Sequence, residues 1–225
     1  MTAAAPAQEP PHVDHEAHGL TRILRIAWMA VALGLLVQVL IVIAKMAVGA
    51  PFPGLRWLPD VLSGITWALI VCAGVGLGVA AGEARKAVMG VLGMISAPLG
   101  FLAAKGVQRA VQAFVEAPVD KIAPLFYATA VVRTVEYAVL GAALGWLLSR
   151  PGSGAKSFAL AGFLAGLVFG AITLWLNLTM GQPKPPQLAA LAVNELLFPI
   201  GCAVVIFLAS RAGRMVATLQ DRGAA

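Results

Sequence analysis

The chain has 225 residues, of which 60% are hydrophobic and only 12% are charged. A soluble domain carries about twice that charged fraction, so the composition excludes an ordinary soluble globular domain. The net charge of +6 does not indicate a nucleic-acid partner, because the basic residues are spread over the segment ends and no nucleic-acid motif is present. Basic residues beside membrane helices instead set topology and contact anionic lipid head groups.

The first 20 residues are polar and contain proline, and we expect them to form a disordered cytoplasmic tail. This stretch is too acidic for the n-region of a signal peptide, so the apolar segment after it is predicted to be a retained membrane helix. His12, His15 and His18 recur in the tail at intervals of three residues. Imidazoles suit zinc, copper or nickel, but without a fixed scaffold adventitious binding is the favoured interpretation, and no cofactor is predicted.

Six apolar segments long enough to cross a bilayer follow. They predict an all-α polytopic membrane domain over residues 21–211 and a short cytoplasmic tail over residues 212–225. The expected helices cover about 22–47, 58–82, 86–114, 122–149, 156–179 and 187–210.

The third of these segments has two further features. Pro98 near its middle predicts a kink, because proline removes a helical hydrogen bond. Its last part carries Val107, Val111 and Phe114 on one face. We expect this part to leave the membrane as an amphipathic extension at the interface.

Counting basic residues orients the helices. One side of a six-span topology holds Arg22, Arg25, Arg85, Lys86, Arg150, Lys156, Arg211, Arg214 and Arg222. The other side holds Lys45, Arg56, Lys105, Arg109, Lys121 and Lys184. The excess of nine over six predicts that both termini face the cytoplasm, in a multi-pass protein of an inner membrane.

The loops on the outer side suggest three related helical hairpins. Each returning helix begins near a proline, at Pro59, Pro124 and Pro186, with spacings of 65 and 62 residues. Internal repeats are common among transporters, but so biased a composition also produces chance matches. The sequence leaves both interpretations open.

Glycines recur four residues apart in three of the segments, and this spacing lets helices approach closely. Ordinary packing of a closed inner half is the favoured interpretation. The two cysteines, Cys72 and Cys202, lie in apolar segments and are expected to be free and buried, although a disulfide is not excluded. The glycines are Gly74, Gly78, Gly82, Gly141, Gly145, Gly162, Gly166 and Gly170.

Polar side chains gather at a common depth in the outer half of the bundle. Counted from the outer helix ends at about 1.5 Å per residue, they lie roughly 10–15 Å below the surface. Interhelical or backbone bonding is the favoured role for Gln38, Ser63, Thr66 and Ser96. Closer to the rim lies Asn177, and Trp67, Tyr137 and Trp175 are expected to add aromatic surface.

Three ionisable residues at this depth predict a functional site, because a charge in lipid costs roughly 2.5–3.5 kcal/mol. Arg133 and Glu136 lie three residues apart on one helix and can pair. Glu195 is then protonated, shares Arg133, or binds a cation from outside. Pro199 frees the carbonyl of Glu195 from its helical hydrogen bond, and with Asn194 this favours a role for the segment in lining an interior site.

The sequence therefore predicts a small membrane transport protein, or the substrate-binding membrane component of one, rather than an enzyme. No GxSxG, HExxH or Asp-rich cluster supports catalysis. The expected partners are the lipid bilayer and a small polar or charged ligand. Other membrane subunits or further copies of the chain are additional candidate partners. The alternative function is a non-catalytic accessory or structural subunit of a larger membrane complex, with its glycines against partner helices. The predicted ligand-binding residues are Arg133, Glu136, Asn194, Glu195, Gln38 and Asn177.

Overall fold

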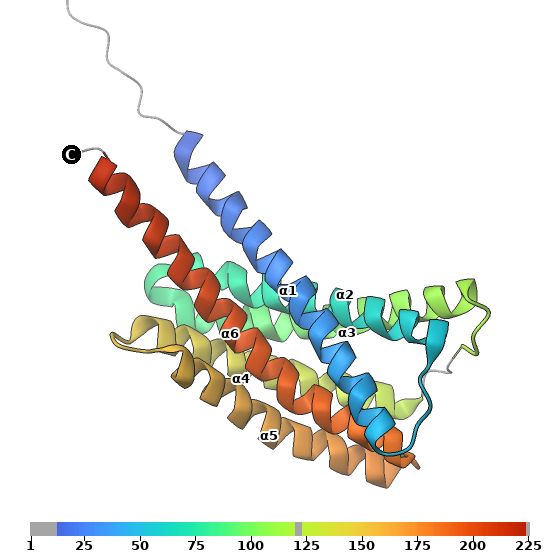
Figure 1. Cartoon of the computed structure of the whole chain (residues 1–225). Helices are drawn as coiled ribbons and strands as arrows, with labels where there is room; N and C mark the ends of the chain where they lie inside the picture. Colours follow the sequence, from blue (N-terminus) through green and yellow to red (C-terminus); the bar gives the residue numbers. More distant parts are fainter. Residues whose placement is uncertain (1–12, 120–122, 224–225) are drawn as a thin grey trace, which may run out of the picture.

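The computed structural model describes residues 13–119 and 123–223 and contains six long helices and no strand in these residues. The long helices are α1 (Val13–Ala47), α2 (Leu58–Leu77), α3 (Arg85–Phe114), α4 (Pro124–Ser149), α5 (Ala155–Met180) and α6 (Pro185–Gly223). Short 3₁₀ helices η1 (Gly54–Trp57), η2 (Gly78–Ala80) and η3 (Gly82–Ala84) lie in the connections before and after α2. The predicted all-α class with six membrane-length helices is confirmed (Figure 1).

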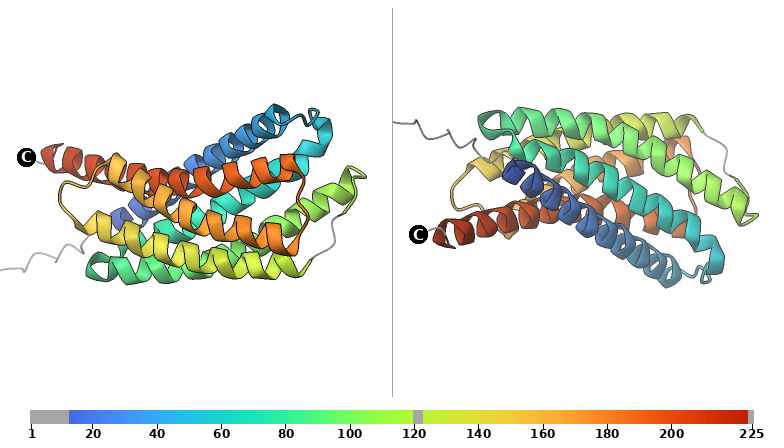
Figure 2. Two further views of the ribbon diagram at one scale, coloured as in Figure 1. Left: turned by 90° about the horizontal axis from the view of Figure 1, so that it is seen from below. Right: turned by 90° about the horizontal axis from the view of Figure 1, so that it is seen from above.

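The long helices form a closed ring. Each packs against its neighbours in the chain, and α1 also packs along α6. The helices α1, α2 and α3 form one side of the bundle, and α4, α5 and α6 form the other (Figure 2). We call the end with the last turn of α1 the Lys45 end, and the end from which α1 and α6 project the Arg211 end (Figure 1).

Both terminal helices are longer than the sequence predicts. Residues 13–20 and 212–223 belong to α1 and α6, whereas they were expected to be tails. Residues 1–12, including His12, lie outside the described part of the chain. The second helix ends at Leu77 rather than at residue 82, because the backbone tightens into η2 and Gly82 adopts a positive φ of 56°.

The other boundaries agree closely with the expected ones. Prolines occupy the first turn of α2 and α4, and α6 begins at Pro185, as predicted for the returning helices. The helix α3 runs without a break through Pro98 to Phe114, whose side chain is exposed. Its position at a membrane interface and the three-hairpin repeat remain predictions.

Several glycines lie at close contacts between helices of this chain. A Cβ at Gly78 would lie 2.6 Å from Met89 on α3, and one at Gly145 would lie 2.7 Å from the Cα of Lys86. On α5, a Cβ at Gly162 would lie 2.5 Å from the Pro199 carbonyl oxygen of α6. Such distances leave no room for a side chain, so glycine sets how closely these helices pack.

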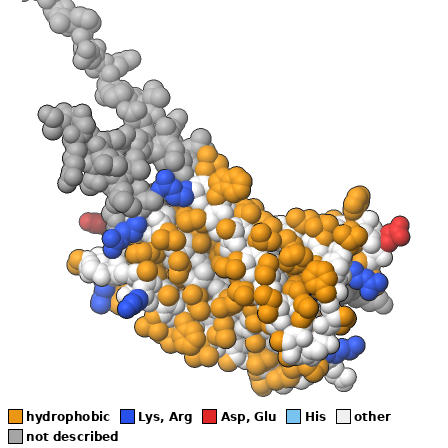
Figure 3. Space-filling view, in the orientation of Figure 1, with side chains coloured by type: hydrophobic (Ala, Val, Ile, Leu, Met, Phe, Trp, Pro, Cys, Tyr) orange, Lys and Arg blue, Asp and Glu red, His pale blue; other side chains and the backbone are white. Residues whose placement is uncertain are grey.

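The outer surface is apolar. Large hydrophobic side chains are exposed along α1, α3, α4 and α5, and at fewer positions of α2 and α6. Hydrophobic atoms cover most of the face in Figure 3, and the Lys and Arg side chains lie toward its two ends. Together with the lengths of the helices, this surface is that of a multi-pass membrane protein that contacts the lipid bilayer.

Candidate functional site

A three-residue ion cluster lies inside the bundle. Arg133 on α4 donates from Nη1 to Oε2 of Glu136 at 2.8 Å, and from Nη2 to Oε1 of Glu195 on α6. The three residues are only 4%, 0% and 2% exposed. Of the three alternatives for Glu195, the structure therefore has the one in which it shares Arg133.

Local features of α5 and α6 bring Glu195 to this position. A Cβ at Gly170 would lie 2.8 Å from the Cβ of Glu195, and one at Gly166 would lie 2.5 Å from its carbonyl oxygen. Pro199 lies in the next turn of α6 and offers no amide to that oxygen. The α5 glycines thus seat the segment of α6 that carries the carboxylate.

The cluster has an uneven charge count. Arg133 supplies one positive charge, whereas two carboxyl groups surround it. Oε1 of Glu136 and Oε2 of Glu195 are buried and have no hydrogen-bond partner among the described residues. A buried charge is tolerated only when it is paired, so the cluster can accept one further positive charge, such as a proton.

Aromatic rings surround the cluster on the side of α2. The Trp67 ring lies 5.7 Å from Cζ of Arg133, within the range of a cation–π contact. Tyr137 and Phe198 lie with their ring centroids 5.5 and 5.8 Å from that of Trp67. These rings fix one face of the guanidinium group and shield it from lipid.

A cavity of about 260 Å³ begins at this cluster and extends toward the Lys45 end. Its polar lining comes from five helices and consists of Gln38, Ser63, Lys105, Gln108, Arg133 and Asn194. Its aromatic lining consists of Trp67, Phe101, Phe126 and Phe198. A few polar groups set among aromatic rings are the usual composition of a small-molecule site.

A polar network crosses the rim of the cavity. Lys45 on α1 lies 3.5 Å from Oδ2 of Asp60 on α2, and Nε2 of Gln108 on α3 donates to Oδ1 of the same carboxylate at 2.9 Å. Lys105 in turn donates to Gln108 at 3.0 Å. The network ties together the ends of three helices at the point where the cavity opens.

The structure brings most of the predicted ligand-binding residues together. Gln38, Arg133 and Asn194 line the cavity. Glu136 and Glu195 do not line it but accept hydrogen bonds from Arg133. Asn177 is the exception, because it does not line the cavity and donates to the Thr173 carbonyl of its own helix at 2.8 Å. Its inclusion among the ligand-binding residues has no support from the cavity, since depth alone does not say which way a helical side chain points.

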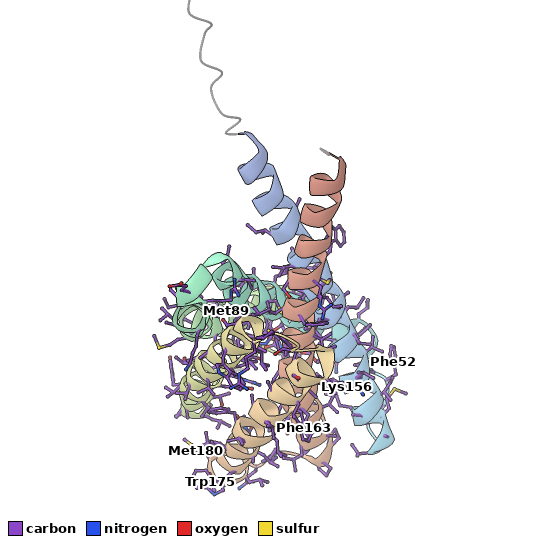
Figure 4. The ribbon with its side chains drawn as sticks, turned by 90° about the vertical axis from the view of Figure 1, so that its left-hand side faces the viewer. Phe52, Met89, Lys156, Phe163, Trp175 and Met180 are labelled. Carbon is purple, nitrogen blue, oxygen red and sulfur yellow. The ribbon has the colours of Figure 1, made fainter. Side chains whose placement is uncertain are left out.

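Some of the other expected polar and aromatic roles agree with the structure, and some do not. Thr66 and Ser96 bond to backbone carbonyls of their own helices, as expected, whereas Ser63 lines the cavity. Trp175 is 61% exposed and points away from the bundle, so it adds no surface to the site (Figure 4). Cys72 and Cys202 are free and buried, as predicted.

The contribution of α3 was missed in the sequence. Phe101, Lys105 and Gln108 recur at intervals of four and three residues, which places them on one helical face. That spacing was available as a signal. Phe101 lies within the expected third membrane segment, whereas the stretch from Lys105 onward is expected to leave the membrane, so the predicted site includes no residue of this face.

Comparisons with protein-family models, with curated proteins and with solved structures each find no match. The fold is a bundle of six membrane-length helices, and the candidate site is a buried ion cluster at the floor of an aromatic-lined cavity. His15 and His18 lie in the first turns of α1, and metal binding by the tail remains a prediction.

Proposed function

We propose that the protein binds a small polar ligand in this cavity, either as a membrane transport protein or as the substrate-binding component of one. The supporting observation is that the cavity reaches from the rim at Lys105 to the buried guanidinium group of Arg133. An ion cluster in the interior of a membrane protein is costly, and such groups usually mark a path for a substrate or an ion.

The lining favours a ligand with a flat apolar body and a polar head. Trp67, Phe101, Phe126 and Phe198 offer ring surfaces, while the amides of Gln38 and Asn194 can both donate and accept hydrogen bonds. Arg133 has five N–H donors and uses two in the contacts with the glutamates, so it retains donors for a ligand. The volume of about 260 Å³ lies below the usual range for drug-sized ligands, about 300–1,000 Å³, and favours a small one.

The distribution of basic residues supports a proposed orientation of the bundle. The excess of Lys and Arg at the Arg211 end favours an arrangement in which that end faces the cytoplasm of a cell with an inner membrane. The cavity would then open on the outer face. Such an arrangement suits the capture of a ligand from outside.

The alternative is a non-catalytic accessory subunit of a larger membrane complex. In that case the recurrent glycines would face helices of a partner. Their contacts argue for the ligand-binding protein, because Gly78, Gly145, Gly162 and Gly166 lie against helices of this chain.

The proposal can be tested by thermal unfolding of the purified protein with a panel of small aromatic carboxylates, nucleobases, amino acids and amines. At least one class should raise the melting temperature. Asn194→Ala removes a lining amide and should abolish the shift. Asn177→Ala is the matched control, because it removes the same side chain outside the cavity and should leave the shift unchanged.

A second measurement separates the two candidate functions. Mass determination after gentle detergent extraction would reveal a stable larger partner in the case of an accessory subunit. A monomer or homo-oligomer without any ligand-dependent shift, or a shift that Asn177→Ala abolishes equally, would contradict the binding site proposed for the cavity.

A further inference from the structure

A second cavity lies at the opposite end of the bundle. It has a volume of about 390 Å³ and lies between the loop that joins α4 to α5 and the part of α6 at the Arg211 end. Arg150 and Arg211 both line it, together with Ser149 and Ser153 of the loop and the buried rings of Phe158 and Phe207. Its position is independent of the cavity at the Lys45 end.

The two arginines are held by aromatic rings rather than by carboxylates. Cζ of Arg150 lies 3.8 Å from the ring centroid of Trp146, and Cζ of Arg211 lies 5.3 Å from that of Phe207. A guanidinium group that stacks on a ring keeps its N–H donors at the edge available for another acceptor. Neither arginine forms an ion pair within the described part of the chain.

The described lining of this cavity is basic. Its lining residues include two cations and no Asp or Glu in the described ranges. Two other arginines of the bundle have partners, because Arg85 donates to the Val79 carbonyl at 2.9 Å and Arg133 is paired with two glutamates. The general excess of Lys and Arg on one side of a membrane accounts for basic residues near helix ends. It does not account for two arginines that stack on aromatic rings and line the same cavity.

We propose that this cavity binds a phosphate-bearing anion, gripped between Arg150 and Arg211. Planar guanidinium groups bind phosphate oxygens through two parallel hydrogen bonds, and both arginines line this cavity. The hydroxyl groups of Ser149 and Ser153 supply further donors to the same hollow. Arg211 closes the last membrane span, so the site lies at the level of lipid head groups.

Two sources of this anion share the same chemistry, an anionic phospholipid head group and a free phosphate compound. The volume exceeds that of inorganic phosphate, and basic pockets between membrane helices commonly take lipid head groups. The experiment therefore needs one arm for each source. Its result does not depend on the ligand proposed for the first cavity.

In the lipid arm, the protein is reconstituted in phosphatidylcholine nanodiscs with and without phosphatidylglycerol, and the lipid that it retains is counted by native mass spectrometry. Arg150→Gln and Arg211→Gln should each lower retention of phosphatidylglycerol about tenfold, the expected effect of losing a charge-assisted hydrogen bond. In the other arm, inorganic phosphate is added to the protein in uncharged detergent, and the melting temperature is measured. A rise that both variants abolish would assign the site to free phosphate compounds as well.

The control variants distinguish binding in this cavity from nonspecific attraction of anions to basic residues. Lys156→Gln removes a cation near the start of α5 that does not line the cavity, and it should change retention less than about twofold (Figure 4). Arg211→Lys keeps the charge but loses the planar fork, so it should also lower retention. Equal losses in Lys156→Gln and the two Arg→Gln variants, full retention in Arg211→Lys, or no preference for phosphate in either arm would overturn the proposal.

Discussion

Gly166 on α5 lies directly against the backbone of Glu195 on α6, and a Cβ at this glycine would stand 2.5 Å from the Glu195 carbonyl oxygen. That carbonyl belongs to the residue whose side chain holds Arg133. Packing between two helices and the geometry of the ion cluster are therefore linked through one residue. A change that pushes the helices apart must also move the carboxylate.

Gly166→Ala should destabilise the protein and disturb the cluster. The new methyl group meets backbone, which cannot rotate away, and overpacking of this kind costs typically about 1–3 kcal/mol. Thermal unfolding in detergent measures the loss. Gly106→Ala is the control, because this helical glycine of α3 has nothing within 4 Å and should gain up to about 1 kcal/mol from helix propensity. Equal effects of the two substitutions would refute the close approach of α5 and α6.

Arg133→Gln should be much more damaging than its single lost charge suggests. It leaves Glu136 and Glu195 buried side by side without a cation, and removing one partner of a buried ion pair costs about 3–5 kcal/mol. The measurement is again the melting temperature, together with the yield of folded protein. Arg56→Gln, at an exposed position in η1, should leave both unchanged. An Arg133 variant as stable as the Arg56 variant would show that the cluster is hydrated.

Glu195→Gln should destabilise the protein far less than Arg133→Gln. The glutamine can still accept a hydrogen bond from Arg133, and the substitution leaves an even pair of Arg133 and Glu136. Because it removes the excess carboxyl group, we expect a stability change within about 1 kcal/mol. If the proposed ligand binds, its affinity or the pH dependence of its affinity should change in this variant. A loss as large as that of Arg133→Gln would mean that Arg133 requires both carboxylates.

The sequence predicts the helices well because their lengths follow from local composition. Apolar runs of membrane length define all six, and the spacing of Arg133 and Glu136 by three residues is enough to predict their pairing. The contact between Arg133 and Glu195 is different, since the two residues are 62 positions apart. It depends on how α4, α5 and α6 pack, which no local pattern contains.

Asn177 illustrates the other limit. Counting residues from a helix end gives the depth of a side chain but not its direction around the helix axis, and Asn177 lies at a plausible depth on α5 while bonding to its own helix. Gln108 shows the converse, because it lines the cavity from the part of α3 that is expected from the sequence to leave the membrane. Side-chain direction and position along α3, rather than the identity of the helices, separate the predicted ligand-binding residues from those that line the cavity.

The rim network supplies a last prediction, in which two partners of one ion pair should differ. Lys45→Ala removes only the contact with Asp60, which is 3.5 Å long and about one-third exposed, so it should cost no more than about 1 kcal/mol and less in high salt. Asp60→Ala also takes the acceptor from Gln108 and should cost about 1 kcal/mol more. Unfolding of both variants at low and high salt measures the difference. The additional loss of stability in Asp60→Ala should persist at high salt, because the bond from Gln108 involves an uncharged donor. If the two variants lose the same stability at both salt concentrations, Asp60 does not join α2 to α3.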